Sequence, residues 1–299
     1  MRAVVQYGTG GPEVLKVEDR PKPERGDGEV LIRVEAIAVP FYETQLRSGL
    51  LGAAGEPAIF GHEAAGTIVE ADDPALTGRR VVTMSFTGGA YAEFVVASQF
   101  TLVPGTVSAE QAVAAAVPAS VALALMDAAD VKAGETVLVE AASGAIGGYL
   151  ARLAGRKGAR VITTAGKGKA DIDHNDPDWR KHVPEGLDVV FESIGGPRAA
   201  EIAVKLAPRG RILAYGLLSG EFPVFSVADL APRGLTLIGF GGMDAYAKDV
   251  AAARDEALDL VADGTLTPVI DRIYPLADAA AAHAHVESRE GVGKVLLVP

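Results

Sequence analysis

The 299-residue sequence contains no cysteine. This single absence excludes disulfide bonds, thiolate metal ligands and a cysteine nucleophile. Positive charge is also scarce, because 28 Lys and Arg residues stand against 39 Asp and Glu residues, for a formal net charge of −11. The basic residues form scattered pairs such as Arg79-Arg80 rather than a stripe. We therefore expect neither nucleic acid nor an anionic membrane as the main partner.

Long apolar segments are missing as well. Residues 1–10 lack the apolar core of a secretory signal. The longest uncharged apolar run, Gln111–Met126, is expected to be too short to cross a bilayer, and Pro118 interrupts it. We therefore expect a cytoplasmic protein with no membrane partner. The length of the chain suggests two domains rather than a single core.

What the sequence does contain is a change of periodicity along its length. Residues 1–110 alternate apolar and polar side chains over short runs, which predicts a mainly antiparallel β-rich domain. Residues 111–264 alternate alanine-rich helical stretches with apolar strands, which predicts an α/β domain with a parallel sheet. Residues 265–299 return to extended character, with one short helix, and are assigned to the β-rich domain. The polar segment Ala170–Val183 is predicted to be a surface loop.

The α/β domain opens with a candidate anion site. The β-rich run Thr136–Val139 leads into Ala141-x-x-Gly144-x-x-Gly147, and a helix-compatible segment follows. A second β-rich run, Ala159–Thr164, completes the βαβ order. Small residues let the backbone turn tightly, and the helix N-terminus offers unpaired N–H groups to a pyrophosphate. The pattern predicts a dinucleotide site, although Ala141 stands where the usual fingerprint has its first glycine.

The charges after the second strand favour NADPH over NADH. An NAD-specific site places a carboxylate near this strand end, but no acidic residue occurs before Asp171. A hydroxyl at Thr164 and the lysines Lys167 and Lys169 suit a 2′-phosphate. The alternative is that both lysines are solvated loop charges. The candidate cofactor-binding residues are Ala142, Ser143, Gly144, Ala145, Ile146, Gly147, Thr164, Lys167, Lys169, Ser193 and Gly216.

Two side chains beside the glycine turn need separate interpretations. Ser143 is expected to contact phosphate or to cap the following helix. Glu140 precedes the turn, where a carboxylate would repel a pyrophosphate unless it turns away or pairs with a cation.

Seven short motifs, in this order and spacing, are typical of one enzyme family. They are Gly10–Leu15, Gly28–Val34, Gly61–Gly66, Gly89–Phe94, Asp188–Phe191, Gly195-Gly196 and Gly291–Val295. With the glycine turn, they resemble the zinc-independent quinone oxidoreductase and enoyl reductase group of the medium-chain dehydrogenase/reductase superfamily. The resemblance implies a Rossmann domain beside a β-rich GroES-like catalytic domain, with the active site in the cleft between them. It also implies NADPH-dependent reduction of a small quinone or conjugated carbonyl substrate.

The same resemblance implies an assembly and one departure. Relatives pair through the last strand of the Rossmann sheet, and the apolar segment Leu235–Phe240 suits such an edge, so we expect a homodimer. Relatives carry a full helix and a further strand between Thr164 and Leu187. This chain has only a short polar link there, which should leave the adenine end of the cofactor site more open.

Zinc is not expected. Residues 61–63, Gly-His-Glu, resemble the metal-binding motif of the zinc-dependent branch, but no thiolate exists and Pro40 stands where the first one would be. A single histidine with a carboxylate would be an under-coordinated site. His62 is therefore interpreted as a hydrogen-bonded residue. His283 and His285 lie two apart on a predicted helix and should point to different faces.

The candidate catalytic residues are Tyr42, Glu43 and Ser120. Relatives often place an asparagine, a tyrosine and a threonine near the nicotinamide, and by spacing this chain has apolar residues at all three positions: Pro40, Leu51 and Leu123. Tyr42 is either a proton donor to the enolate or a packing residue. Glu43 is predicted to be an ordering carboxylate paired with an arginine.

Three functions stay open at this point. The first is an NADPH-dependent reductase of quinones, enones or enoyl thioesters. The second is a reductase-fold enzyme retuned for one specialised substrate, such as a natural-product intermediate, which the three apolar replacements favour. The third is a non-catalytic nucleotide-binding protein with the same fold.

Overall fold

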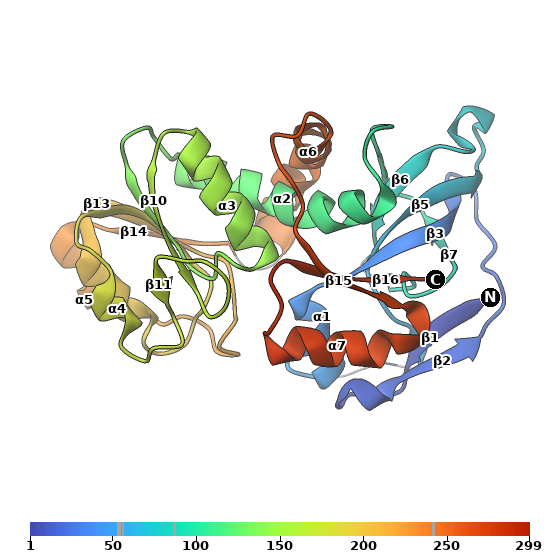
Figure 1. Cartoon of the computed structure of the whole chain (residues 1–299), viewed down its shortest axis with the longest axis horizontal. Helices are drawn as coiled ribbons and strands as arrows, with labels where there is room; N and C mark the ends of the chain where they lie inside the picture. Colours follow the sequence, from blue (N-terminus) through green and yellow to red (C-terminus); the bar gives the residue numbers. More distant parts are fainter. Residues whose placement is uncertain (53–54, 56, 86–87, 241–242) are drawn as a thin grey trace. The chain divides into compact units, whose positions relative to one another are not determined.

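The computed structural model describes residues 1–52, 55, 57–85, 88–240 and 243–299, with the backbone alone for residues 243–248. The chain divides into two compact units (Figure 1). Unit 1 comprises Met1–Val117 and Arg254–Pro299, and unit 2 comprises Pro118–Ala253. Two long helices, α2 (Ala109–Ala129) and α6 (Met243–Ala262), each contribute to both units.

Unit 1 is built on β-sheets. Its strands are β1 (Arg2–Gln6), β2 (Leu15–Asp19), β3 (Val30–Val39), β4 (Ala58–Ile59), β5 (Glu63–Glu70), β6 (Arg80–Met84), β7 (Phe94–Ala97), β8 (Thr101–Leu102), β15 (Ile270–Pro275) and β16 (Lys294–Val298). A three-stranded sheet has the order β2-β1-β4, and a seven-stranded sheet has the order β15-β16-β3-β5-β6-β8, with β7 also paired to β3. Because β16 pairs antiparallel with β3, the C-terminal strand completes the sheet that the N-terminal residues begin.

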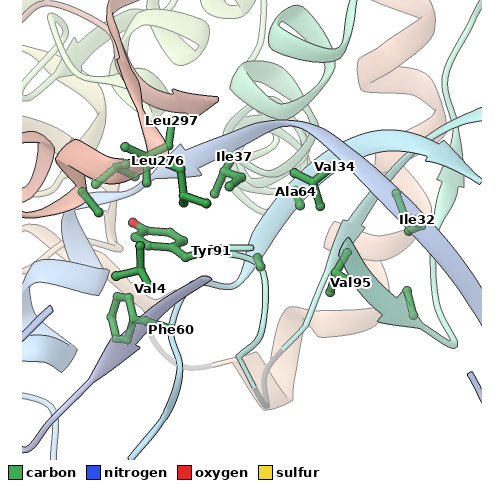
Figure 2. Packing of buried hydrophobic residues seen from close by; sticks show 14 of the residues in the cluster. Val4, Ile32, Val34, Ile37, Phe60, Ala64, Tyr91, Val95, Leu276 and Leu297 are labelled. Atoms are coloured by element: carbon green, nitrogen blue, oxygen red, sulfur yellow. The ribbon is translucent and has the colours of Figure 1, made fainter. Parts of the chain in front are cut away.

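The hydrophobic core of unit 1 includes buried side chains of β3. Figure 2 shows Tyr91 among Val4, Phe60 and Leu276, all of which belong to one buried hydrophobic cluster. The helices α1 (Phe41–Ser48) and α7 (Ala279–Ser288) lie side by side in this unit (Figure 1).

Unit 2 holds a six-stranded sheet whose neighbouring strands all pair in parallel. Its strands are β9 (Thr136–Val139), β10 (Arg160–Ala165), β11 (Ile172–Asp173), β12 (Leu187–Glu192), β13 (Leu206–Ala214) and β14 (Thr236–Gly239). The order is β11-β10-β9-β12-β13-β14. From β9 the chain adds β10 and β11 on one side of this strand, and then adds β12, β13 and β14 on the other side. Such a reversal is the switch point at which open parallel sheets bind ligands. The helices of unit 2 are α3 (Ala145–Arg156), α4 (Trp179–His182) and α5 (Val227–Leu230).

The prediction of a surface loop over Ala170–Val183 was wrong in part. Residues Ile172 and Asp173 form β11, which pairs in parallel with β10. The short helix α4 follows, and Trp179 is only 3% exposed within the hydrophobic cluster of unit 2. One tryptophan and its aliphatic neighbours are enough to anchor a segment that is polar on average.

The length argument for the apolar run Gln111–Met126 was also wrong, because α2 continues for 21 residues through Pro118. Among the described residues, α2 alone is long and apolar enough to cross a membrane by length and composition. Within its most apolar window, 72% of the residues are buried inside the structure. A core helix meets the same criteria of length and composition.

Candidate functional site

The turn after β9 forms an open helix N-terminus at the switch point. Ala141 adopts a positive φ of 50°, and Gly144 precedes α3 with no side chain bonded to the helix end. The first backbone N–H of this helix that is bonded within the helix belongs to Gly148, which donates to the Gly144 carbonyl at 3.0 Å. Ser143 therefore does not cap the helix, and the N–H groups of residues 145–147 are directed to a ligand or to solvent.

Glycine is required at two points of this edge. A Cβ on Gly147 would lie 2.5 Å from the Ala141 carbonyl oxygen, so only glycine lets α3 approach the turn this closely. A Cβ on Gly216, just beyond β13, would overlap the backbone of Ser193, just beyond β12. The sequence-predicted residues Ser193 and Gly216 are thus in contact.

Thr164 supports the turn from the neighbouring strand. It is fully buried, and its hydroxyl accepts the Ala141 N–H at 3.2 Å and lies 3.3 Å from Nδ1 of His174. Its carbonyl accepts the Ala142 N–H at 2.8 Å. The threonine therefore orders the turn, while Lys167 and Lys169 are exposed beyond the end of β10.

Glu140 turns away from the open turn and into the sheet. Its side chain is 1% exposed, and Oε2 accepts the N–H groups of Ser193 and Ile194 at 3.1 and 3.3 Å. Burial, followed by the nearby charge of Glu192, raises the pKa of Glu140 to about 8. Of the two arrangements considered for this carboxylate, the structure has the one that turns away.

In unit 1, α1 places Glu43 at the centre of a buried polar network. This helix starts after Pro40, in an extended conformation, and ends at Gly49, which has a positive φ of 90°. Glu43 Oε1 accepts the His62 backbone N–H at 2.8 Å and lies 2.9 Å from His62 Nδ1, while Oε2 accepts the Tyr91 hydroxyl at 2.6 Å. Burial raises the pKa of Glu43 despite these partners.

The prediction that Glu43 pairs with an arginine was wrong. Arg47, one turn further along α1, forms an ion pair with Glu287 on α7 and donates to the Gly10 carbonyl at 2.9 Å. His62 and Tyr91 take the place that the sequence analysis gave to an arginine.

The network continues from Tyr91 to a second histidine. The Tyr91 hydroxyl lies 3.0 Å from His283 Nε2, and burial lowers the pKa of His283 to about 3, so this imidazole is neutral at physiological pH. Gly61 has a φ of 87°, and a Cβ there would overlap the Tyr91 ring. His285 instead bonds Asp271 at 2.6 Å, so the two histidines occupy different faces of α7, as expected.

Tyr42 and Glu63 form the second part of this polar cluster. The Tyr42 hydroxyl makes a long hydrogen bond of 3.5 Å to Glu63 Oε1, and Lys294 Nζ lies 3.2 Å from Glu63 Oε2. Burial and the nearby carboxylates raise the pKa of Tyr42, which keeps the phenol protonated. The Tyr42 ring lies 5.9 Å from the ring of His62.

The structure brings two of the three candidate catalytic residues together. Tyr42 and Glu43 share the cluster of unit 1, whereas Ser120 is fully buried on the part of α2 that belongs to unit 2. The sequence analysis missed Tyr91 and Lys294 as members of this cluster. Both lie in motifs that it had singled out, and Lys294 is a lone charge beside four apolar residues, which is a signal for a buried ion pair.

Comparisons with known proteins agree with both units. Residues 26–107 match the family described as alcohol dehydrogenase GroES-like domain, and residues 169–297 match the family described as zinc-binding dehydrogenase. The chain is 31% identical to the quinone oxidoreductase of Pseudomonas aeruginosa, covering 97% of each. The chain belongs to the medium-chain dehydrogenase/reductase superfamily, in its quinone oxidoreductase-like group. The predicted family, the predicted pairing of a GroES-like with a Rossmann-type domain, and the prediction of an oxidoreductase are confirmed.

Two solved structures of this family resemble the chain over its whole length. The Escherichia coli quinone oxidoreductase, complexed with NADPH, is 25% identical with a TM-score of 0.90, and covers 100% of both chains. A mycobacterial protein complexed with NADPH is 31% identical with a TM-score of 0.88, again over 100% of both chains.

The residues of this quinone oxidoreductase-like chain do not fit zinc, despite the description of the matching family. His62 Nδ1 is directed to Glu43, and both oxygens of Glu63 already have partners in Tyr42 and Lys294. In the part of the chain that the structure describes, no group of three or more His, Cys, Asp or Glu side chains could hold a metal ion. With no cysteine in the sequence, the thiolates that zinc prefers are also missing.

Proposed function

We propose that this oxidoreductase binds NADPH and reduces a quinone or an α,β-unsaturated carbonyl compound without zinc. The observation that carries the proposal is the open N-terminus of α3, which is held close to the turn at Ala141 because Gly147 has no side chain. Backbone N–H groups and the positive end of the helix dipole suit a diphosphate there. Ser193 and Gly216, at the same edge of the sheet, would border the bound coenzyme.

The preference for NADPH rests on the end of β10. The first acid after this strand, Asp171, accepts the Thr163 N–H and hydroxyl, each at 2.8 Å. Its carboxylate is therefore already bonded, and it is a poor acceptor for a ribose 2′-hydroxyl. The exposed lysines Lys167 and Lys169 would attract a 2′-phosphate instead.

Reduction of an enone needs a hydride and then a proton. When bound, the reduced nicotinamide supplies the hydride. Tyr42 is assigned to donate the proton or to hydrogen-bond the enolate, since its raised pKa keeps the hydroxyl protonated. Glu43 orders the cluster, because it fixes both the backbone and the ring of His62. No step requires a metal ion.

The proposal extends to a homodimer through the Rossmann sheet. Among the described strands, β14 is at one edge of that sheet, where its backbone groups can pair with a second copy. Leu237 on this strand is 38% exposed, and Phe222 and Val227 nearby in the sequence are more exposed still. Sedimentation showing only monomer at micromolar concentration would contradict the dimer.

The reaction is tested by mixing the protein with NADPH and a panel of quinones, enones and enoyl thioesters, and following absorbance at the reduced nicotinamide band. Turnover with simple quinones or enones supports the proposal. Turnover with only one restricted substrate would favour the retuned enzyme that the apolar residues Pro40, Leu51 and Leu123 suggest. Saturable NADPH binding with no turnover on any acceptor would contradict both enzyme functions.

A further inference from the structure

Two glutamates meet at the switch point of the Rossmann sheet. Phe191 on β12 is in register with Val139 on β9, so the next residues along, Glu192 and Glu140, lie side by side at the carboxyl ends of the two central strands. Both side chains are fully buried, at 0% and 1% exposure. Two carboxyl groups in such a place are costly unless they are paired and hydrogen-bonded.

The two carboxyl groups fix the loop that follows β12. Glu140 Oε2 accepts the N–H groups of Ser193 and Ile194, and Glu192 Oε1 accepts the N–H of Gly195. The Ser193 hydroxyl also donates to the Glu140 carbonyl at 3.3 Å. The backbone N–H groups of residues 193–195 are thus all bonded to the two glutamate side chains. This loop lies at the same sheet edge as the open turn before α3.

One oxygen of the pair requires a proton. Glu192 Oε2 is buried and has no hydrogen-bond partner. A proton on either carboxyl group supplies the missing donor and makes a hydrogen bond between Glu140 and Glu192. The orphaned oxygen therefore indicates that the pair holds one shared proton.

The charged groups around the pair also agree with one bound proton. Arg180 on α4, 7% exposed and stacked 4.4 Å over the Trp179 ring, is a cation whose charge lowers the pKa of both carboxyl groups. Tyr215, beyond β13, bonds Ser193, and burial raises its pKa, so it is neutral. Two carboxylates and one guanidinium leave one negative charge, which the shared proton cancels.

On the β10 side, Thr164 and the His174 ring lie next to the turn that follows Glu140. Thr164 holds the Ala141 N–H, and its other neighbour is the His174 ring. Burial raises the pKa of both carboxyl groups, and that of Glu140 reaches about 8. The pair therefore keeps its proton at neutral pH and loses it a little above.

We propose that Glu140 and Glu192 are positioning residues of the coenzyme site, and that their shared proton must be present for the coenzyme diphosphate to bind tightly. The inference rests on the proposed NADPH site. Loss of the proton would leave an uncancelled, buried negative charge at the sheet edge where the diphosphate would bind, and repulsion is strong in such a region of low dielectric. It also removes the hydrogen bond that holds the two carboxyl groups, and with them residues 193–195, in place. NADPH binding must then take up a proton wherever the free protein has lost it.

The test is the dissociation constant for NADPH, measured by fluorescence titration between pH 7.0 and 9.5. This range lies above the second ionisation of a phosphate, at about pH 6, so the coenzyme charge is constant. For the wild type we expect the constant to rise by about thirtyfold across the range, as one linked proton with a pKa of about 8 allows. Glu140→Gln fixes a neutral amide that can still accept the Ser193 N–H and donate to Glu192, so its constant should not change with pH.

Glu135→Gln is the matched control, because Glu135 precedes the amino end of the same strand, β9, and pairs with Arg211. It should keep the wild-type pH dependence. Calorimetry at pH 8.5 in two buffers of different ionisation enthalpy measures the proton directly: the wild type should take up a proton on binding NADPH, and Glu140→Gln should not.

A wild-type constant that does not change with pH, with no proton uptake, would overturn the inference while leaving the NADPH site intact. The same pH slope in Glu140→Gln as in the wild type would also overturn it. Absence of NADPH binding at pH 7.0 would instead contradict the proposed function. Should Glu140→Gln not fold, Glu192→Gln and the wild-type measurements decide the question.

Discussion

Lys294 Nζ lies 3.2 Å from Glu63 Oε2, and the two side chains are only 7% and 1% exposed. Lys294 begins β16 near the end of the chain, and Glu63 begins β5. The ion pair therefore joins the Gly-His-Glu motif at residues 61–63 to the C-terminal Gly291–Val295 motif. It also gives the carboxylate of that first motif a buried internal partner.

We expect Lys294→Met to destabilise the protein by about 3 kcal/mol, because it leaves the buried carboxylate of Glu63 without its cation. Urea unfolding measures the change. The control is Lys22→Met, since Lys22 pairs with Glu70 at 2.9 Å but both side chains are about half exposed. That exposed pair should contribute between zero and about 1 kcal/mol. Equal losses in the two variants would show that the buried pair has no special role.

The close approach of α3 to its turn predicts different effects for two adjacent glycines. Gly147→Ala places a Cβ 2.5 Å from the Ala141 carbonyl oxygen, so the helix must shift away from the turn. In Gly148→Ala the nearest atom is the Ala142 carbonyl oxygen at 3.4 Å, an ordinary contact. We expect NADPH affinity to fall by about tenfold or more in Gly147→Ala, as a shift of the phosphate-binding N–H groups requires. Gly148→Ala should bind as the wild type does.

The assignment of Tyr42 predicts a loss of rate without a loss of coenzyme. Tyr42→Phe removes the hydroxyl, and a proton donor contributes about 10²- to 10⁴-fold to a rate, so kcat should fall by about 10²-fold or more. The NADPH dissociation constant should stay within about twofold. Tyr274→Phe, which removes another unit 1 hydroxyl, near Arg272, is the control and should change neither value. A Tyr42→Phe enzyme with wild-type kcat would remove Tyr42 from the mechanism.

The raised pKa of Glu140 predicts how the stability of unit 2 depends on pH. The folded value of about 8 lies above the ordinary value of 4.5, so between these limits the folded chain binds more protons than the unfolded chain. Its contribution to stability is complete below about pH 4.5 and is lost as the pH rises through 8. Between pH 6 and 9 we expect the wild type to lose on the order of 1–3 kcal/mol more than Glu140→Gln.

Trp179 provides the measurement, because it is the single tryptophan of the chain and is packed in the core of unit 2. Urea unfolding followed by its fluorescence at pH 6 and pH 9 gives the two free energies. Parallel changes in the wild type and in Glu140→Gln would show that this carboxyl group does not titrate in the range.

The sequence predicted the elements that local patterns define. The strand Thr136–Val139 has the predicted bounds, because β-rich runs next to turns are strong signals. The βαβ order around Gly144 and Gly147 was also predicted, since a glycine turn between a strand and a helix has few alternatives.

Contacts between distant segments could not be predicted in the same way. The pairing of Glu140 with Glu192 depends on the strand order of the sheet, which brings β9 next to β12 and fixes their register. Likewise, the partners of Glu43 come from the turn before β5 and from Tyr91, so the arginine expected from its own helix was wrong. A polar segment such as Ala170–Val183 is anchored by a few apolar side chains, Ile172, Trp179 and Val183, which average composition does not show.

The most direct test of the whole account is a titration with NADPH of protein that has been dialysed against a chelator and checked by elemental analysis, followed by addition of a quinone. The account predicts less than about 0.1 zinc per chain, saturable binding with one site per chain, and oxidation of the bound NADPH when the quinone is added. Stoichiometric zinc that is needed for activity, or no uptake of NADPH by the folded protein, would contradict it.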